Sequence, residues 1–143
     1  MTAYLLDVNV LLALSDPRHI HHEAAHRWFA EEGRHAWATC PLTENAYVRI
    51  ASHPSYPNRP GDAAVVLESL RRFHAVAEHD FWPDDVSLLD LVLPGAAMIH
   101  GQVTDVYLLG LAARRGGKLA TFDRRIPTQV VPGGAEALEV IEP

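Results

Sequence analysis

The sequence has a single cysteine, an excess of acidic over basic residues and no long hydrophobic run. One cysteine among 143 residues, Cys40, excludes an internal disulfide bond and favours a reducing compartment, so we expect a cytoplasmic protein. No apolar run approaches the roughly 20 residues that a membrane helix needs, and we expect no contact with a membrane. The first residues carry no basic stretch before an apolar one, so we expect no signal peptide.

The charge balance separates two kinds of nucleic-acid protein. The chain has 12 Lys and Arg against 18 Asp and Glu, which gives a formal net charge of −6. A passive nucleic-acid binder normally carries a basic footprint, so this balance argues against that class. It is compatible with an enzyme that holds divalent cations in an acidic pocket, because the ion itself supplies positive charge.

Short apolar runs alternate with helical patterns along the chain. With 48% hydrophobic and 21% charged residues and no linker, residues 1–143 are predicted to form one globular domain. We expect strands at 3–6, 36–39, 75–77, 118–122 and 137–141. We expect helices at 8–14, from 20 to about 32, from a cap at Thr43 to 51, from 61 to 73, from a cap at Asp84 to 93, and from a cap at Thr104 to 115. This order predicts an α/β fold in three layers (α/β/α), with a mostly parallel central sheet.

Four acidic residues occupy positions at which such a fold gathers ligands. Asp7 and Asp123 each follow a predicted strand, and parallel sheets bind ligands at the carboxyl ends of their strands. Glu44 and Asp105 fall in the first turn of a helix, where the helix dipole alone stabilises an acid by about 1 kcal/mol or less. Asp123 also has a structural explanation, because aspartate is common in turns.

Asp7 is harder to explain by structure alone, because apolar residues flank it on both sides. Burying an ionised carboxylate without a partner costs several kcal/mol. A hard cation such as Mg²⁺ or Mn²⁺ is one partner that would offset this cost, and it prefers oxygen ligands. A metal ion held by carboxylates can bind a phosphate group and activate a water molecule for attack on it.

The segments around these acids resemble the four signatures of the PIN-domain nucleases and, more closely, of VapC-type toxins from bacterial toxin–antitoxin pairs. The segments are 6–12 (LDVNVLL), 42–44 (LTE), 103–108 (VTDVYL) and 119–124 (LATFDR). The resemblance covers nearly the whole chain. It implies a PIN-like fold and a metal-dependent endoribonuclease that hydrolyses transfer or ribosomal RNA and leaves a 5′-phosphate.

The resemblance also implies roles for individual residues. Three carboxylates would hold Mg²⁺ or Mn²⁺ directly or through water: Asp7, Asp105 and Asp123. Glu44 would be a further ligand or would orient the attacking water, and Asn9 and Thr121 would fix the carboxylates. The implied partners are RNA, a VapB-like antitoxin whose tail occupies the acidic site, and a second copy of the chain in a homodimer.

Basic and histidine residues give weaker signals. Arg124 and Arg125 directly follow Asp123 and are candidates for contacts with RNA phosphates. Arg49 lies five residues after Glu44 and could pair with the acidic cluster or with an antitoxin. In the histidine-rich segment 19–26, two histidines have i,i+4 spacing that could hold zinc, but no further ligand is evident. We favour a solvated face or the mouth of a substrate groove for that segment.

Several other protein classes remain as alternatives. A phosphatase of the haloacid dehalogenase class would need a second aspartate where Asn9 stands. A response-regulator receiver would need a central phosphoacceptor aspartate and a late lysine. A histidine-based ribonuclease would tolerate chelators and leave cyclic phosphate ends. The main alternatives are a catalytically inactive PIN-like module that binds RNA or protein, or another small phosphohydrolase with an acidic pocket. An inactive module usually loses one of the four acids, and this chain retains all of them.

Overall fold

The computed structural model describes all residues from 1 to 143. Its centre is a sheet of five parallel strands in the order β3-β2-β1-β4-β5. The strands are β1 (Tyr4–Leu6), β2 (Trp37–Thr39), β3 (His79–Phe81), β4 (Lys118–Thr121) and β5 (Leu138–Val140). The helices are α1 (Val8–Ser15), α2 (His22–Glu31), α3 (Pro41–Ala51), α4 (Ala63–Ala75), α5 (Leu88–Leu91) and α6 (Val103–Arg114).

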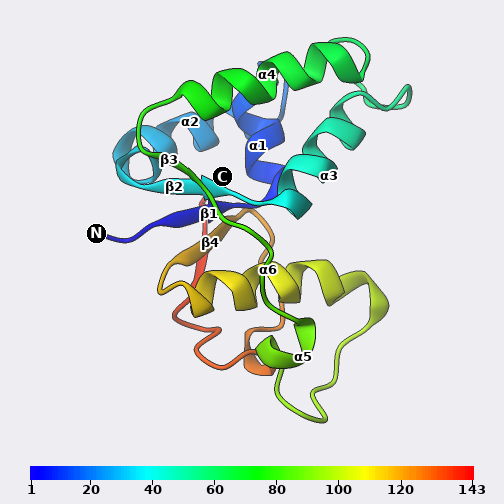
Figure 1. The fold of residues 1–143 in the computed structure, drawn as a ribbon. Helices are drawn as coiled ribbons and strands as arrows, with labels where there is room; N and C mark the ends of the chain where they lie inside the picture. Colours follow the sequence, from blue (N-terminus) through cyan, green and yellow to red (C-terminus); the bar gives the residue numbers. More distant parts are fainter.

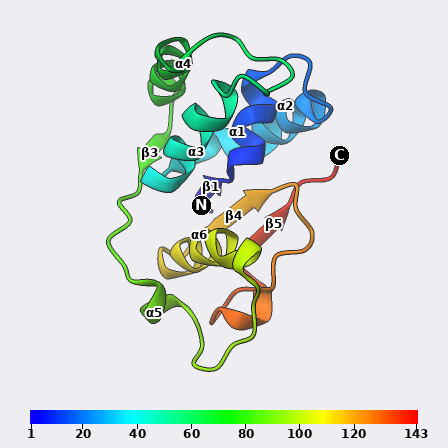
Figure 2. The same ribbon diagram turned by 90° about the vertical axis from the view of Figure 1, so that its right-hand side faces the viewer.

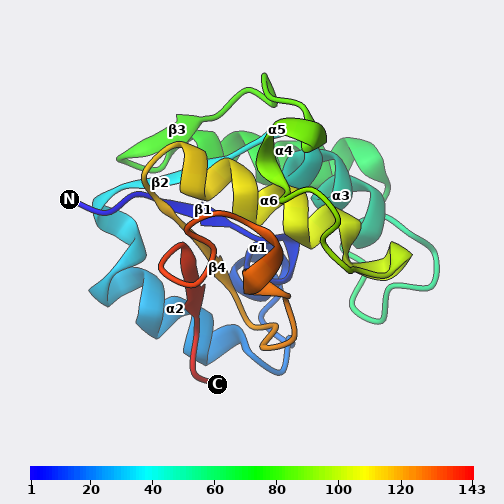
Figure 3. The same ribbon diagram turned by 90° about the horizontal axis from the view of Figure 1, so that it is seen from below.

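The helices form two layers on opposite sides of the sheet. Helices α1 to α4 lie on one side, whereas α5 and α6 lie on the other (Figure 1). The segment between β3 and α5 passes from the first layer to the second (Figure 2). From below, α6 lies across β1 and β4, which it contacts (Figure 3). The predicted three-layer α/β architecture is therefore confirmed, and the sheet is parallel throughout.

The central strands are apolar on both faces because both faces are covered. Leu6, Trp37 and Ala120 belong to the core under α1, α2 and α3. Leu5 and Leu119, which point to the opposite face, belong to the core under α6. The near-continuous apolar runs in the sequence follow from this double burial.

Several predicted boundaries are wrong. The third strand is His79–Phe81 rather than 75–77, because α4 continues to Ala75. Ser87, not Asp84, caps α5, which is a single turn and ends before Leu93. At the start of the chain's second helix, Ile20 is 88% exposed instead of packed inward.

The caps of α3 and α6 also differ from the prediction. Helix α3 begins at Pro41 with Cys40 as its N-cap, because proline suits the first helical turn. Thr43 lies inside that turn, and its hydroxyl accepts the Cys40 N–H at 3.0 Å. Gln102 rather than Thr104 precedes α6. Glu44 and Asp105 nevertheless fall in first turns, as predicted.

No helix of the structure has both the length and the apolar character required to cross a membrane.

Candidate active site

Three of the four predicted acids gather beside the carboxyl ends of β1 and β4. These strands are neighbours in the parallel sheet, so the residues that follow them meet at the same edge. Asp7 follows β1 and is 4% exposed, and Asp123 follows β4. Asp105 reaches the same place from the first turn of α6, and its carboxyl interacts electrostatically with those of Asp7 and Asp123.

Hydrogen bonds hold the Asp7 carboxylate in one orientation. Its Oδ1 accepts the Val8 N–H at 2.7 Å, so Asp7 is also the N-cap of α1. Its Oδ2 accepts the Thr121 hydroxyl at 2.8 Å. Thr121 is fully buried and in turn accepts Asn9 Nδ2–H at 3.0 Å and the Asp123 N–H at 3.1 Å. The structure thus brings Asn9 and Thr121 together with two of the acids.

The pKa values of Asp7 and Asp105 are both raised. Burial raises the pKa of Asp7 despite the hydrogen bonds from Thr121 and Val8, and the charge of Asp123 raises it further. Burial and the charges of Asp7 and Asp123 raise the pKa of Asp105 to about 6, against the opposing charge of Arg125. A divalent cation at this position would favour the ionised forms of Asp7 and Asp105.

The donor set fits a hard cation. All the available side-chain donors in the cluster are carboxylate oxygens, which Mg²⁺ and Mn²⁺ prefer. Three carboxylates leave positions in the coordination shell of such an ion for water molecules, which is usual for Mg²⁺.

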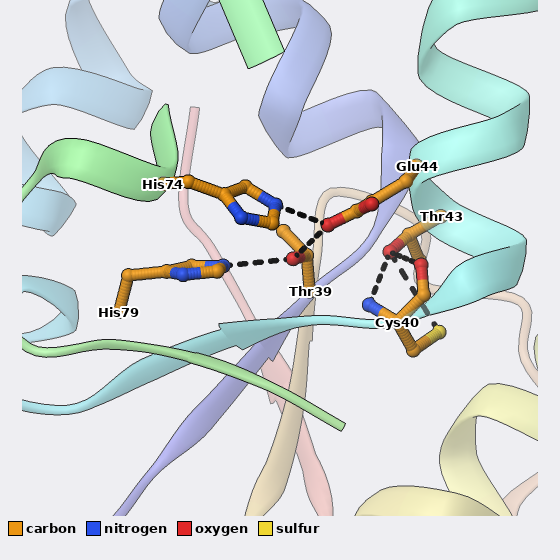
Figure 4. A network of polar contacts seen from close by, with 6 residues as sticks. All are labelled: Thr39, Cys40, Thr43, Glu44, His74 and His79. Carbon is orange, nitrogen blue, oxygen red and sulfur yellow. Dashed lines mark hydrogen bonds and ion pairs between the residues drawn. The ribbon is translucent and has the colours of Figure 1, made fainter. Parts of the chain in front are cut away.

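The carboxylate of Glu44, the fourth predicted acid, makes its contacts with residues other than these aspartates. Its Oε2 accepts the Thr39 hydroxyl at 2.6 Å and lies 2.5 Å from His74 Nε2. His79 Nε2 lies 2.8 Å from the same Thr39 hydroxyl oxygen. Figure 4 shows the two imidazoles and the carboxylate converging above the end of β2. Sequence reasoning missed both histidines because they lie 30 and 35 residues after Glu44, on the end of α4 and on β3.

The predicted RNA-contacting arginines lie at the surface. Arg125 Nε lies 3.3 Å from Asp123 Oδ1, and its side chain is 90% exposed. Arg124 pairs with Glu142 at 2.6 Å. Arg49 is exposed on α3 and, with Glu44, lines an open groove between α3 and α4.

The histidine-rich segment has a structural role for two of its members. His22 Nδ1 lies 2.7 Å from the Ala13 carbonyl oxygen, and His26 Nε2 lies 2.9 Å from that of Leu14. These contacts satisfy carbonyls at the end of α1, which have no partner within the helix. The pair therefore joins α2 to α1, while His26 remains exposed to solvent.

Comparison with known proteins identifies the family to which this fold belongs. The model of the PIN domain family matches residues 4–129. Ribonuclease VapC39 of Mycobacterium tuberculosis is 45% identical over 140 residues, 96% of this chain and 100% of the relative. Ribonuclease VapC44 of the same species is 42% identical over 134 residues, 92% of this chain and 94% of the relative.

Solved structures show the same fold at low sequence identity. The crystal structure of M. tuberculosis VapC20, a sarcin-ricin loop cleaving toxin, aligns with a TM-score of 0.61 and 12% identity over 98% of this chain and 99% of that one. VapBC2 from Rickettsia felis, bound to a DNA fragment from its promoter, aligns with a TM-score of 0.60 and 11% identity over 99% and 100%. The chain belongs to the PIN-domain family and, within it, to the VapC-type toxin ribonucleases.

Proposed function

We propose that this chain is a Mg²⁺- or Mn²⁺-dependent endoribonuclease, the toxin of a VapB–VapC-like pair, which hydrolyses phosphodiester bonds in transfer or ribosomal RNA. The observation that carries the metal dependence is the cluster of Asp7, Asp105 and Asp123, in which a buried carboxylate lies with two further acids. Only a fraction of that negative charge is offset by a protein cation, Arg125. Membership of a ribonuclease family supports the reaction itself.

Asp7, Asp105 and Asp123 would hold the ion, directly or through water. When bound there, such an ion would bind the scissile phosphate and lower the pKa of the water molecule that attacks it. Thr121 and Asn9 would keep the ligands in place, because Thr121 bonds both the Asp7 carboxylate and the backbone of Asp123.

Substrate contacts would come from exposed side chains around the cluster. Arg124 and Arg125 extend from the segment after β4 and would pair with RNA phosphates. Arg49 would contribute from α3. Glu44 would orient the attacking water, and for this its carboxylate would have to leave Thr39 and His74.

The proposed partners follow from the acidic site. An arginine of a VapB-like antitoxin would form charge-assisted hydrogen bonds with the aspartates and block them. The structure of VapBC2 from R. felis, a protein with the same fold, supports a partner of this kind. We also propose that the chain forms a homodimer, as we expected from the resemblance.

The decisive experiment is RNA cleavage in the presence of a chelator. EDTA should abolish cleavage, and Mg²⁺ or Mn²⁺ should restore it. Asp7→Asn should lower the rate by orders of magnitude, whereas Glu68→Gln, which changes an exposed acid on α4, should cleave normally. Circular dichroism would confirm that both variants fold. Sequencing of RNA 5′-ends after brief expression would identify the target.

Two results would contradict this proposal. Robust cleavage in EDTA, with cyclic phosphate ends, would indicate a histidine-based ribonuclease. Tight RNA binding without cleavage under any metal condition would indicate an inactive PIN-like module.

A further inference from the structure

A second group of metal-binding side chains lies outside the aspartate cluster. Glu44, His74 and His79 each offer a ligand atom, and these atoms all lie within 4.8 Å of one another. They come from the first turn of α3, the last turn of α4 and the edge strand β3. We propose that these three residues bind a Zn²⁺ ion at a site separate from the aspartate cluster.

The contacts are close to those of a zinc site. In a tetrahedral site with bonds of about 2.0–2.1 Å, neighbouring ligand atoms lie about 3.3 Å apart. Glu44 Oε2 and His74 Nε2 are closer, at 2.5 Å, and His79 Nε2 reaches the same carboxylate through the Thr39 hydroxyl. A small opening of the Glu44–His74 contact, with a small approach of His79, would make room for the ion.

The ligands are held by rigid neighbours. β3 pairs with β2, so that His79 lies beside Trp37 in the sheet, and its ring packs edge-on against the buried Trp37 ring at 4.6 Å. The His74 ring lies 4.3 Å from the His79 ring. Thr39 is fully buried, and its hydroxyl donates a hydrogen bond to Glu44. Hydrogen bonds of this kind fix the orientation of carboxylates that bind metals.

The type of ligand selects the metal. Two imidazoles and one carboxylate, with a fourth position left for water, are a ligand set typical of zinc. Mg²⁺ prefers oxygen alone and would favour the aspartates. Burial and the charge of His74 lower the pKa of His79, which favours the neutral imidazole that metals bind.

The site is also open to solvent. The His74 side chain is 40% exposed, and with Glu44 it lines an open cavity of about 480 Å³ between α3 and α4. An ion can therefore enter, and water can complete its coordination. Without a metal, the Glu44–His74 contact would be an ordinary surface ion pair, and binding measurements separate these two cases.

The test is zinc binding by the full, chelator-treated chain in excess Mg²⁺, which occupies oxygen-only sites. Calorimetry should show one tight zinc equivalent per chain. His74→Ala and His79→Ala should each weaken its affinity at least about tenfold. The controls are Asp105→Asn, from the aspartate cluster, and His53→Ala, which removes an exposed histidine of a distant loop. Both control variants should bind zinc with the same affinity as the unchanged chain.

Co²⁺ provides a second readout. It should produce a visible absorption band of a four- or five-coordinate ion in the unchanged chain and in both controls, but not in His74→Ala. These measurements need no RNA, so their outcome is independent of the proposed nuclease function. The proposal is overturned if zinc does not bind, if both histidine variants bind it as well as the unchanged chain, or if Asp105→Asn is the variant that loses it.

Discussion

The pKa of Asp105 is raised to about 6 by burial and by the charges of Asp7 and Asp123. In the unfolded chain an aspartate titrates near 3.9. Between these two values the folded state binds the proton more tightly, so the free energy of unfolding falls as the pH rises. The stabilisation from this group is complete below pH 4 and lost above pH 6.

Asp105→Asn should remove this pH dependence. In EDTA at pH 7.5, we expect the variant to be more stable than the unchanged chain by about 1 kcal/mol, a modest figure because solvent screens a half-buried group. At pH 4 the two should be nearly equal. Urea unfolding at both pH values measures the difference. A variant that is equally destabilised at both would show that Asp105 serves the fold and not a charged site.

The residues of the aspartate cluster were predictable because each follows from a local pattern. Asp7 and Asp123 follow buried strands, and Asp105 lies in the first turn of a helix. The position of the Glu44 side chain was not predictable, because it depends on His74 and His79, which are distant in sequence. No periodicity connects a histidine at the end of a helix with one on an edge strand.

At the scale of elements, strands buried on both faces were found from their composition, whereas β3, one of the two edge strands, was not. β1, β2 and β4 consist mainly of buried apolar residues. β3 has the sequence His-Asp-Phe and is largely exposed, so it lacks the apolar run that marks a strand. The run at 75–77, which we took for that strand, instead includes the end of α4.

The contact between α5 and α6 depends on a residue without a side chain. Gly110 lies in the middle of α6, and a Cβ added there would lie 2.8 Å from the Cβ of Leu91 on α5. Alanine would normally stabilise a helix interior by about 1 kcal/mol relative to glycine. Here the collision involves a Cβ fixed to the α5 backbone, so α5 has to move.

We therefore expect Gly110→Ala to destabilise the chain by about 1–3 kcal/mol in urea unfolding. Gly101→Ala is the matched control, because a Cβ there meets nothing within 4 Å. It should change stability by no more than about 0.5 kcal/mol. A Gly110→Ala variant as stable as the unchanged chain would mean that α5 packs loosely.

For the whole molecule, the strand order places two different ligand sets along one sheet. The aspartates gather beside β1 and β4, and the group of Glu44, His74 and His79 lies beside β2 and β3. The formal net charge of −6 makes cations the natural ligands of such a surface. Glu44 belongs by prediction to the first set and by observed contacts to the second.

The Glu44 carboxylate cannot bind zinc beside His74 and His79 and orient the attacking water at the same time. We therefore expect zinc to inhibit cleavage. With Mg²⁺ in excess, an equivalent of zinc would hold the Glu44 carboxylate beside His74 and His79, away from the aspartates. We expect RNA cleavage by the unchanged chain to fall by about a hundredfold or more, the scale of a lost contribution to general acid–base catalysis. The measurement is the initial rate across a zinc titration.

The histidine variants identify the origin of that inhibition. His74→Ala, compared with its own zinc-free rate, should be insensitive to the zinc concentrations that inhibit the unchanged chain. Equal inhibition of both would indicate that zinc displaces Mg²⁺ from Asp7, Asp105 and Asp123. If calorimetry shows zinc bound by Glu44, His74 and His79 while cleavage continues unchanged, Glu44 has no part in the reaction, and the three aspartates suffice for catalysis.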